Sequence, residues 1–202
     1  MKFSTKVNNA INQAAIWHKD QVRKDFERTP YVAHPYSVML MLSEFTNDED
    51  ILIASLFHDV LEDVDLNLAE IIEKEYGSKV IEIVKALSED KDPKRQTDAK
   101  ATWRSRKLGY LEHLKIAPEE VLLISCADKL DNYHALAMTI ESHGLDTALE
   151  KFNAPLKNQL WFADAIIEIF KHRLEGHPLV NSLSQTINHI KNVSSPKLLG
   201  SE

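Results

Sequence analysis

The residues able to do chemistry in this chain lie where two apolar segments end. ILIASLF (51–57) runs directly into His58 and Asp59, and VLLISCA (121–127) runs directly into Asp128. An ionised carboxylate at the end of a buried segment is unfavourable unless a cation or several hydrogen-bond donors meet it. The sequence therefore predicts a cation beside Asp59 and Asp128.

Histidine side chains can complete a site for such a cation. His58 precedes Asp59, and His34 precedes Pro35, a residue type favoured at the first position of a helix. Two imidazole nitrogens and two carboxylate oxygens suit Mn²⁺, Fe²⁺, Co²⁺ or Zn²⁺ better than Ca²⁺ or Mg²⁺. Taken singly, a His-Asp pair is more often a surface or capping feature, and Asp128 can form an ordinary ion pair. Taken together, these residues predict a site for one divalent metal ion, with the ligands His34, His58, Asp59 and Asp128.

Two further carboxylates follow one turn later in HDVLED (58–63). Glu62 lies four residues after His58, and Asp63 four residues after Asp59, so a continuous helix extends them along the same face. Carboxylates beside a water molecule at a metal are natural groups for taking and returning its proton. The alternative is that Asp63 is a solvated residue at the end of a helix. The pattern predicts Glu62 and Asp63 as the catalytic pair.

Helices must position these residues, because apolar residues recur at helical spacing through nearly the whole chain. The expected helices are 5–20, one opened by His34-Pro35, 48–63, 68–76, 78–88, 98–114, 119–141, 147–174 and 179–191. Gly77, Pro118 and Gly144 punctuate them, and the polar stretch 88–98 is typical of a surface loop. The sequence predicts one all-α domain over residues 1–192, followed by a frayed tail over 193–202.

Composition limits the function classes. With 24 Lys and Arg against 31 Asp and Glu, the net charge of -7 disfavours general binding to nucleic acid or to an anionic membrane. A small phosphorylated substrate stays compatible, because a metal ion and a few basic residues can reverse the charge locally. No apolar run resembles a membrane span or a secretory signal, and the single Cys126 suits a reducing cytoplasm. WFADAIIEIF (161–170) is explained equally by core packing and by a dimer face, so a homo-oligomer stays open.

Four ordered motifs resemble the hydrolase domain of RelA/SpoT homologues, and most of all the stand-alone small alarmone hydrolases. The motifs are HKDQVRK (18–24), PYVAHP (30–35), HDVLED (58–63) and ADKLDN (127–132). The likeness spans about residues 10–140. It implies a single-domain HD-type helical bundle that uses Mn²⁺ to hydrolyse the 3′-diphosphate of (p)ppGpp, the guanosine tetra- and pentaphosphate alarmones of the stringent response. Because 202 residues leave no room for a synthetase domain, we expect an enzyme that only degrades.

The resemblance also implies a role for each matched residue. Metal ligation falls to the same set of His34, His58, Asp59 and Asp128, and activation of the attacking water falls to Glu62 and Asp63. Contacts with the nucleotide are implied for Arg23, Lys24, Lys107 and Asn132.

Three positions depart from the family pattern. His134 stands where the family usually has Arg, Asp20 replaces a common Gly, and Asp131 adds a negative charge. A guanidinium offers phosphate a bidentate fork that an imidazole cannot copy. Two alternatives therefore stay open: an HD phosphohydrolase acting on another phosphorylated nucleotide, and a catalytically weak module that binds a nucleotide or a protein partner.

Overall fold

The computed structural model describes residues 4–88, 101–150 and 154–198, and every regular element in this part is a helix. The all-α prediction is confirmed. Contacts divide the chain into two compact units, residues 1–90 with 123–128 and residues 91–122 with 129–202. The predicted loop 88–98 lies almost wholly outside the described residues. Within the described residues, no helix combines the length and the hydropathy that a membrane crossing requires.

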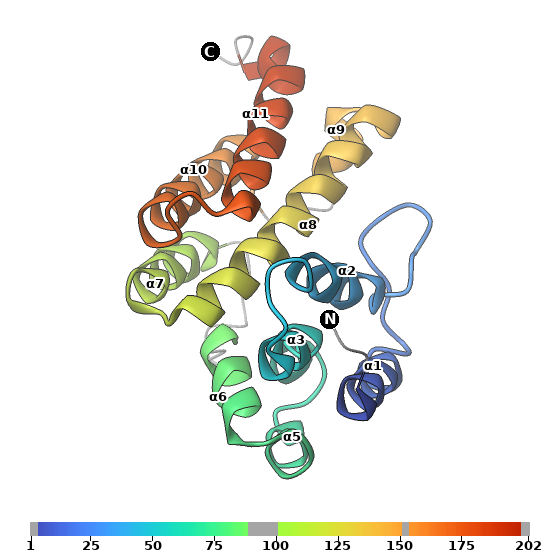
Figure 1. The fold of residues 1–202 in the computed structure, drawn as a ribbon. Coiled ribbons are helices and arrows are strands. Elements are labelled where there is room, and N and C mark those ends of the chain that lie inside the picture. Colours follow the sequence, from blue (N-terminus) through green and yellow to red (C-terminus); the bar gives the residue numbers. More distant parts are fainter. Residues whose placement is uncertain (1–3, 89–100, 151–153, 199–202) are drawn as a thin grey trace. The chain divides into compact units, whose positions relative to one another are not determined.

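The first unit is organised around the apolar helix that precedes His58. Its helices are α1 (Thr5–Trp17), α2 (Ala33–Leu42), α3 (Glu49–Leu56), α4 (Val60–Asp63), α5 (Leu68–Tyr76) and α6 (Ser78–Leu87), with Leu123–Asp128 of the long helix α8 (Glu119–His143). Helix α3 packs against α1, α2 and α6, which surround it in Figure 1. Leu52, Ile53 and Leu56 are fully buried, so α3 needs no polar face.

The second unit is organised around α10 (Leu156–Arg173), which packs against α7 (Trp103–Ile116) and α11 (Pro178–Leu198). The carbonyls at the end of α7 have no partner within their own helix. The Arg173 guanidinium donates to three of these carbonyls, those of Leu114, Lys115 and Ala117. A side chain of α10 therefore caps the C-terminal end of α7.

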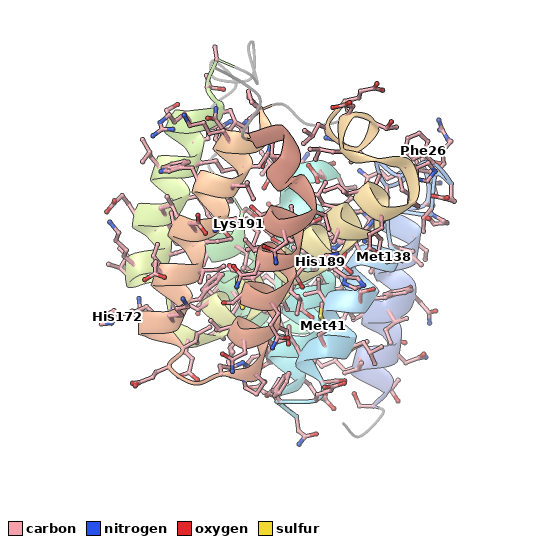
Figure 2. All side chains as sticks on the ribbon, turned by 90° about the horizontal axis from the view of Figure 1, so that it is seen from above. Phe26, Met41, Met138, His172, His189 and Lys191 are labelled. Carbon is pink, nitrogen blue, oxygen red and sulfur yellow. The ribbon has the colours of Figure 1, made fainter. Side chains whose placement is uncertain are left out.

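Helix α11 carries His189 and Lys191, both labelled in Figure 2, and both form ion pairs. His189 pairs with Glu141 of α8, and Lys191 pairs with Asp164 of α10. These groups are exposed or half-exposed, so the pairs orient α11 more than they stabilise it.

Two predicted helix boundaries in this unit were wrong. The predicted helix 147–174 is two helices, α9 (Leu145–Leu149) and α10, because Pro155 disfavours a helical residue before it. Helix α11 continues to Leu198, past the predicted end at 191 and into the segment predicted as a frayed tail. Ser194 is fully buried, which anchors this extension. Residues 199–202 lie outside the described part, and the domain boundary at 192 stays a prediction.

We expect Phe57→Ala to lower the free energy of unfolding by about 3–5 kcal/mol, the usual loss for a large buried ring. Phe57 has no exposed surface, and its ring centre lies 4.9 Å from the ring centres of both Trp17 and Tyr76. Urea denaturation measures the loss. Phe45→Ala is the control, because Phe45 is 41% exposed and should lose less than about 1 kcal/mol. Equal losses in the two variants would contradict this account of the core.

Candidate metal centre

The chain leaves the helical path between α3 and α4, at the residues predicted to bind the metal. Helix α3 ends at Leu56 and α4 begins at Val60, with Phe57 in a non-helical conformation. The predicted continuous helix over 48–63 is therefore wrong at this point. The break removes the 100° separation that a helix imposes on neighbouring side chains. Nε2 of His58 lies 3.1 Å from Oδ2 of Asp59, so adjacent residues converge on one point.

His58 has a defined tautomer because one of its nitrogens is already bonded. Its Nδ1 lies 2.7 Å from the carbonyl oxygen of Ser55, which can only accept, so Nδ1 carries the proton. Nε2 of the neutral ring is then a bare lone pair directed into the site. A backbone carbonyl that holds the far nitrogen of a histidine is the usual support of a metal ligand.

The four predicted ligands come together in the first unit. Nε2 of His34 lies 3.2 Å from Nε2 of His58 and 3.2 Å from Oδ1 of Asp128. The same atom lies 3.7 Å from Oδ2 of Asp59. Ligating atoms of His34, His58 and Asp59 all lie within 4.8 Å of one another, a separation that suits a shared ion. Three of the predicted ligands come from the start of a helix or from a helix break, and the fourth, Asp128, comes from the interior of α8.

The site is nearly closed to solvent, and its charges favour a cation at the centre. His34 is 2% exposed and His58 is 5% exposed. Burial raises the pKa of Asp59, but His58 and His34 lower it more, so the pKa falls below its ordinary value. Burial lowers the pKa of His58, but Asp59 and Asp128 raise it more. Two carboxylates and two imidazoles make a donor set whose negative charge a single divalent ion would offset.

Tyr31 is part of this site, although the sequence did not assign it a role. Its hydroxyl donates a hydrogen bond to Oδ2 of Asp59. Burial and the charge of Asp59 raise the pKa of Tyr31 well above its ordinary value, so the hydroxyl remains a donor. The available signal was its place in the PYVAHP motif, three residues before His34, in the loop that leads into α2.

The predicted catalytic pair lies on α4, one turn beyond Asp59. The backbone N–H groups of Glu62 and Asp63 both donate to the carbonyl of Asp59, at 3.2 and 2.8 Å. The side chain of Glu62 is half-buried, whereas Asp63 is exposed. Glu62 and Asp63 are therefore tied through the backbone to a candidate metal ligand, in one short helix.

The residues predicted to contact a nucleotide fall in both units. Arg23 and Lys24 belong to the loop between α1 and α2 of the first unit, where Arg23 is half-buried and Lys24 is exposed. Lys107 belongs to the second unit, and its Nζ lies 5.0 Å from the ring centre of Phe162. Asn132, on α8, also belongs to the second unit. The nucleotide contacts of all four residues stay predictions.

Comparison with known proteins points to one family. A family model described as HD domain matches residues 10–160. The guanosine-3′,5′-bis(diphosphate) 3′-pyrophosphohydrolase MESH1 of Drosophila melanogaster is 36% identical over 135 residues, which cover 66% of this chain and 70% of that protein. The guanosine-3′,5′-bis(diphosphate) 3′-pyrophosphohydrolase of Aquifex aeolicus is 31% identical over 79% of this chain and 22% of its own length. A solved structure, described as a metazoan orthologue of SpoT that hydrolyses ppGpp, superposes with a TM-score of 0.74 at 27% identity, covering 93% of this chain and 97% of that one.

We expect Tyr31→Phe to weaken the binding of Mn²⁺ by about 10-fold or more, because supporting contacts to a ligand typically contribute that much. Calorimetric titration of metal-free protein measures the change. The matched control is Tyr36→Phe, which removes a hydroxyl that donates to the carbonyl of Ile11 at 2.7 Å. Equal Mn²⁺ affinities in Tyr31→Phe and Tyr36→Phe would show that the Tyr31 hydroxyl does not support the metal site.

Proposed function

The chain belongs to the HD domain family, and from this premise we propose that it hydrolyses (p)ppGpp to GDP or GTP and pyrophosphate. The observation that carries the proposal is the convergence of His34, His58, Asp59 and Asp128 next to a helix bearing Glu62 and Asp63. Relatives with 36% and 31% identity bear the name of this 3′-pyrophosphohydrolase activity.

We infer that the four converging residues hold one divalent ion, and we propose Mn²⁺ as this ion. The bare Nε2 of His58, fixed by the Ser55 carbonyl, supports this role. When bound, such an ion would acidify a nearby water molecule and offset the negative charge of the attacked phosphate. Tyr31 would hold the Asp59 carboxylate in the orientation that ligation requires.

We further propose that Glu62 and Asp63 transfer the proton. We assign to this pair the orientation of the attacking water and the acceptance of its proton. The water oxygen forms a bond to the phosphorus attached to ribose O3′, and the P–O3′ bond breaks. The same proton is then available to the departing O3′, so the nucleotide leaves with a 3′-hydroxyl. The half-buried position of Glu62 makes it the preferred acceptor of the two.

The phosphates of the substrate need local positive charge, because the chain as a whole has a net charge of -7. Arg23 and Lys24 supply two cations on the loop that also contains Tyr31. Guanidinium and ammonium groups bind phosphate oxygens through charge-assisted hydrogen bonds. Lys107 and Asn132 complete the proposed nucleotide contacts. A small nucleotide as the partner, together with the buried thiol of Cys126, suits a cytoplasmic enzyme.

A second candidate function changes only the substrate. His134 stands where the RelA/SpoT pattern usually has Arg, which removes a permanent positive charge. This departure favours a phosphorylated nucleotide with fewer or differently placed phosphates. Faster turnover of such a compound than of ppGpp, by the same Mn²⁺-loaded protein, would select the second candidate.

We expect Asp59→Ala and Glu62→Gln to abolish pyrophosphate release from ppGpp for different reasons. Asp59→Ala should lose the metal together with the activity. Glu62→Gln should keep stoichiometric Mn²⁺ and lose about 10²–10⁴-fold in kcat, the usual contribution of a positioned acid or base. Metal analysis and product chromatography separate the two effects.

The control for this experiment is Glu82→Gln, at an exposed glutamate of α6, which should retain parental activity. Intact ppGpp after incubation with fully metal-loaded parent protein would reject the proposed substrate. Tight nucleotide binding without turnover would instead support a binding module.

A further inference from the structure

The loop over residues 18–32 holds the one-turn helix α4 at both ends. At the start of α4, the Tyr31 hydroxyl donates to the carboxylate of Asp59. At its end, the side-chain Nε2 of Gln21 donates to the carbonyl oxygen of Asp63, with 2.6 Å between nitrogen and oxygen. A single helical turn gains little stability from its own hydrogen bonds. Tertiary contacts must therefore set the orientation of α4: Val60 and Leu61 are buried, and the loop holds both ends of the helix.

The two arms of the loop are paired, which places alternate side chains of each arm on the same side. The Tyr31 N–H donates to the Gln21 carbonyl at 2.9 Å, and the Arg23 N–H donates to the Thr29 carbonyl at 2.8 Å. An isolated antiparallel bridge lies between these two hydrogen bonds. Side chains alternate along such arms, so Arg23 lies on the same face as Gln21 and Tyr31. Val22 lies on the opposite face. The arm that holds α4 thus directs Arg23 to the same side.

A buried histidine fixes the orientation of the Gln21 amide. His18 is 1% exposed, and its Nδ1 lies 2.6 Å from Oε1 of Gln21. Because Nε2 of Gln21 donates to a carbonyl, Oε1 faces the ring and Nδ1 of His18 carries the proton. Within the described residues, the other ring nitrogen of His18 has no hydrogen-bond partner. The ring of His18 therefore makes its hydrogen bond to Gln21. Along the series His18–Gln21–Asp63, each hydrogen bond is donated toward Asp63.

We propose that Gln21 is a positioning residue that fixes Glu62 and Asp63 relative to the phosphate-binding residues Arg23 and Lys24. The inference rests on the proposed function, which assigns proton transfer to Glu62 and Asp63. The hydrogen bond from Gln21 to α4 goes to a backbone carbonyl and not to a carboxylate, so its effect on the reaction passes through the placement of that helix.

The metal ligands have supports that do not include Gln21. Tyr31 holds Asp59, and the Ser55 carbonyl holds His58. Asp128 comes from the separate helix α8. Loss of the Gln21 amide should therefore disturb the catalytic pair and leave the metal site formed.

The test compares Gln21→Met, which keeps the length of the side chain but lacks donor and acceptor, with Gln13→Met on α1 of the same unit. In Mn²⁺-loaded Gln21→Met, we expect kcat on ppGpp to fall about 10- to 100-fold, the scale of a misplaced catalytic group. Amide hydrogen exchange across residues 59–65 should become faster. Mn²⁺ affinity should stay within about 3-fold of the parent, because the ligand supports remain. Gln13→Met should match the parent in all three measurements.

A double variant separates positioning from a general structural effect. If Gln21 acts through Glu62, then Gln21→Met combined with Glu62→Gln should be no slower than Glu62→Gln alone, within about 3-fold, because residues that act as a unit are not additive. Multiplication of the two losses would overturn the inference, as would parental kcat with parental hydrogen exchange in Gln21→Met. If the parent leaves ppGpp intact, the proposed function fails by itself. Hydrogen exchange of residues 59–65 then still decides, since equal rates in Gln21→Met and Gln13→Met would overturn the inference.

Discussion

The first unit depends on one electrostatic constraint, the burial of two imidazoles and two carboxylates at a single point. The Nε2 atoms of His34 and His58 are 3.2 Å apart. His58 donates its Nδ1–H to the Ser55 carbonyl, so its Nε2 faces the other ring. A proton between the rings would satisfy one nitrogen pair and leave a net negative charge among the carboxylates. A divalent cation would satisfy all four groups together, beside the buried residues 52–56 of α3.

The break after α3 allows adjacent residues to direct their side chains to this point. A continuous helix would direct His58 and Asp59 about 100° apart. Because the helix ends before Phe57, both side chains reach one point. The helix that follows the break, α4, is therefore only a single turn long. Such a turn cannot orient itself, so its orientation comes from the burial of Val60 and Leu61 and from the hydrogen bonds of the neighbouring loop. The placement of Glu62 and Asp63 is therefore a property of tertiary contacts, not of local helix propensity.

The sequence predicted which side chains lie together better than it predicted the backbone geometry that brings them together. A charged residue directly after an apolar run is visible in one dimension, which is why Asp59 and Asp128 could be paired from the chain alone. The interruption at Phe57 carries no Gly or Pro signal, so periodicity predicted an unbroken helix. The contact from Tyr31 to Asp59 spans 28 residues and depends on how the loop folds back. Local patterns report burial and helix content, but they do not report which polar atoms meet.

Binding and catalysis are coupled in this arrangement if Arg23 and Lys24 bind phosphate as proposed. The cations and the two hydrogen bonds that hold α4 lie on the same paired loop. A chain of net charge -7 offers no general attraction for an anionic substrate, so the phosphates must be recognised at short range. Phosphate contacts that order this loop would also order α4, and the substrate would then help to position the carboxylates that act on it. Binding energy used in this way raises kcat instead of lowering KM, which is how a small site with few cations can favour its transition state.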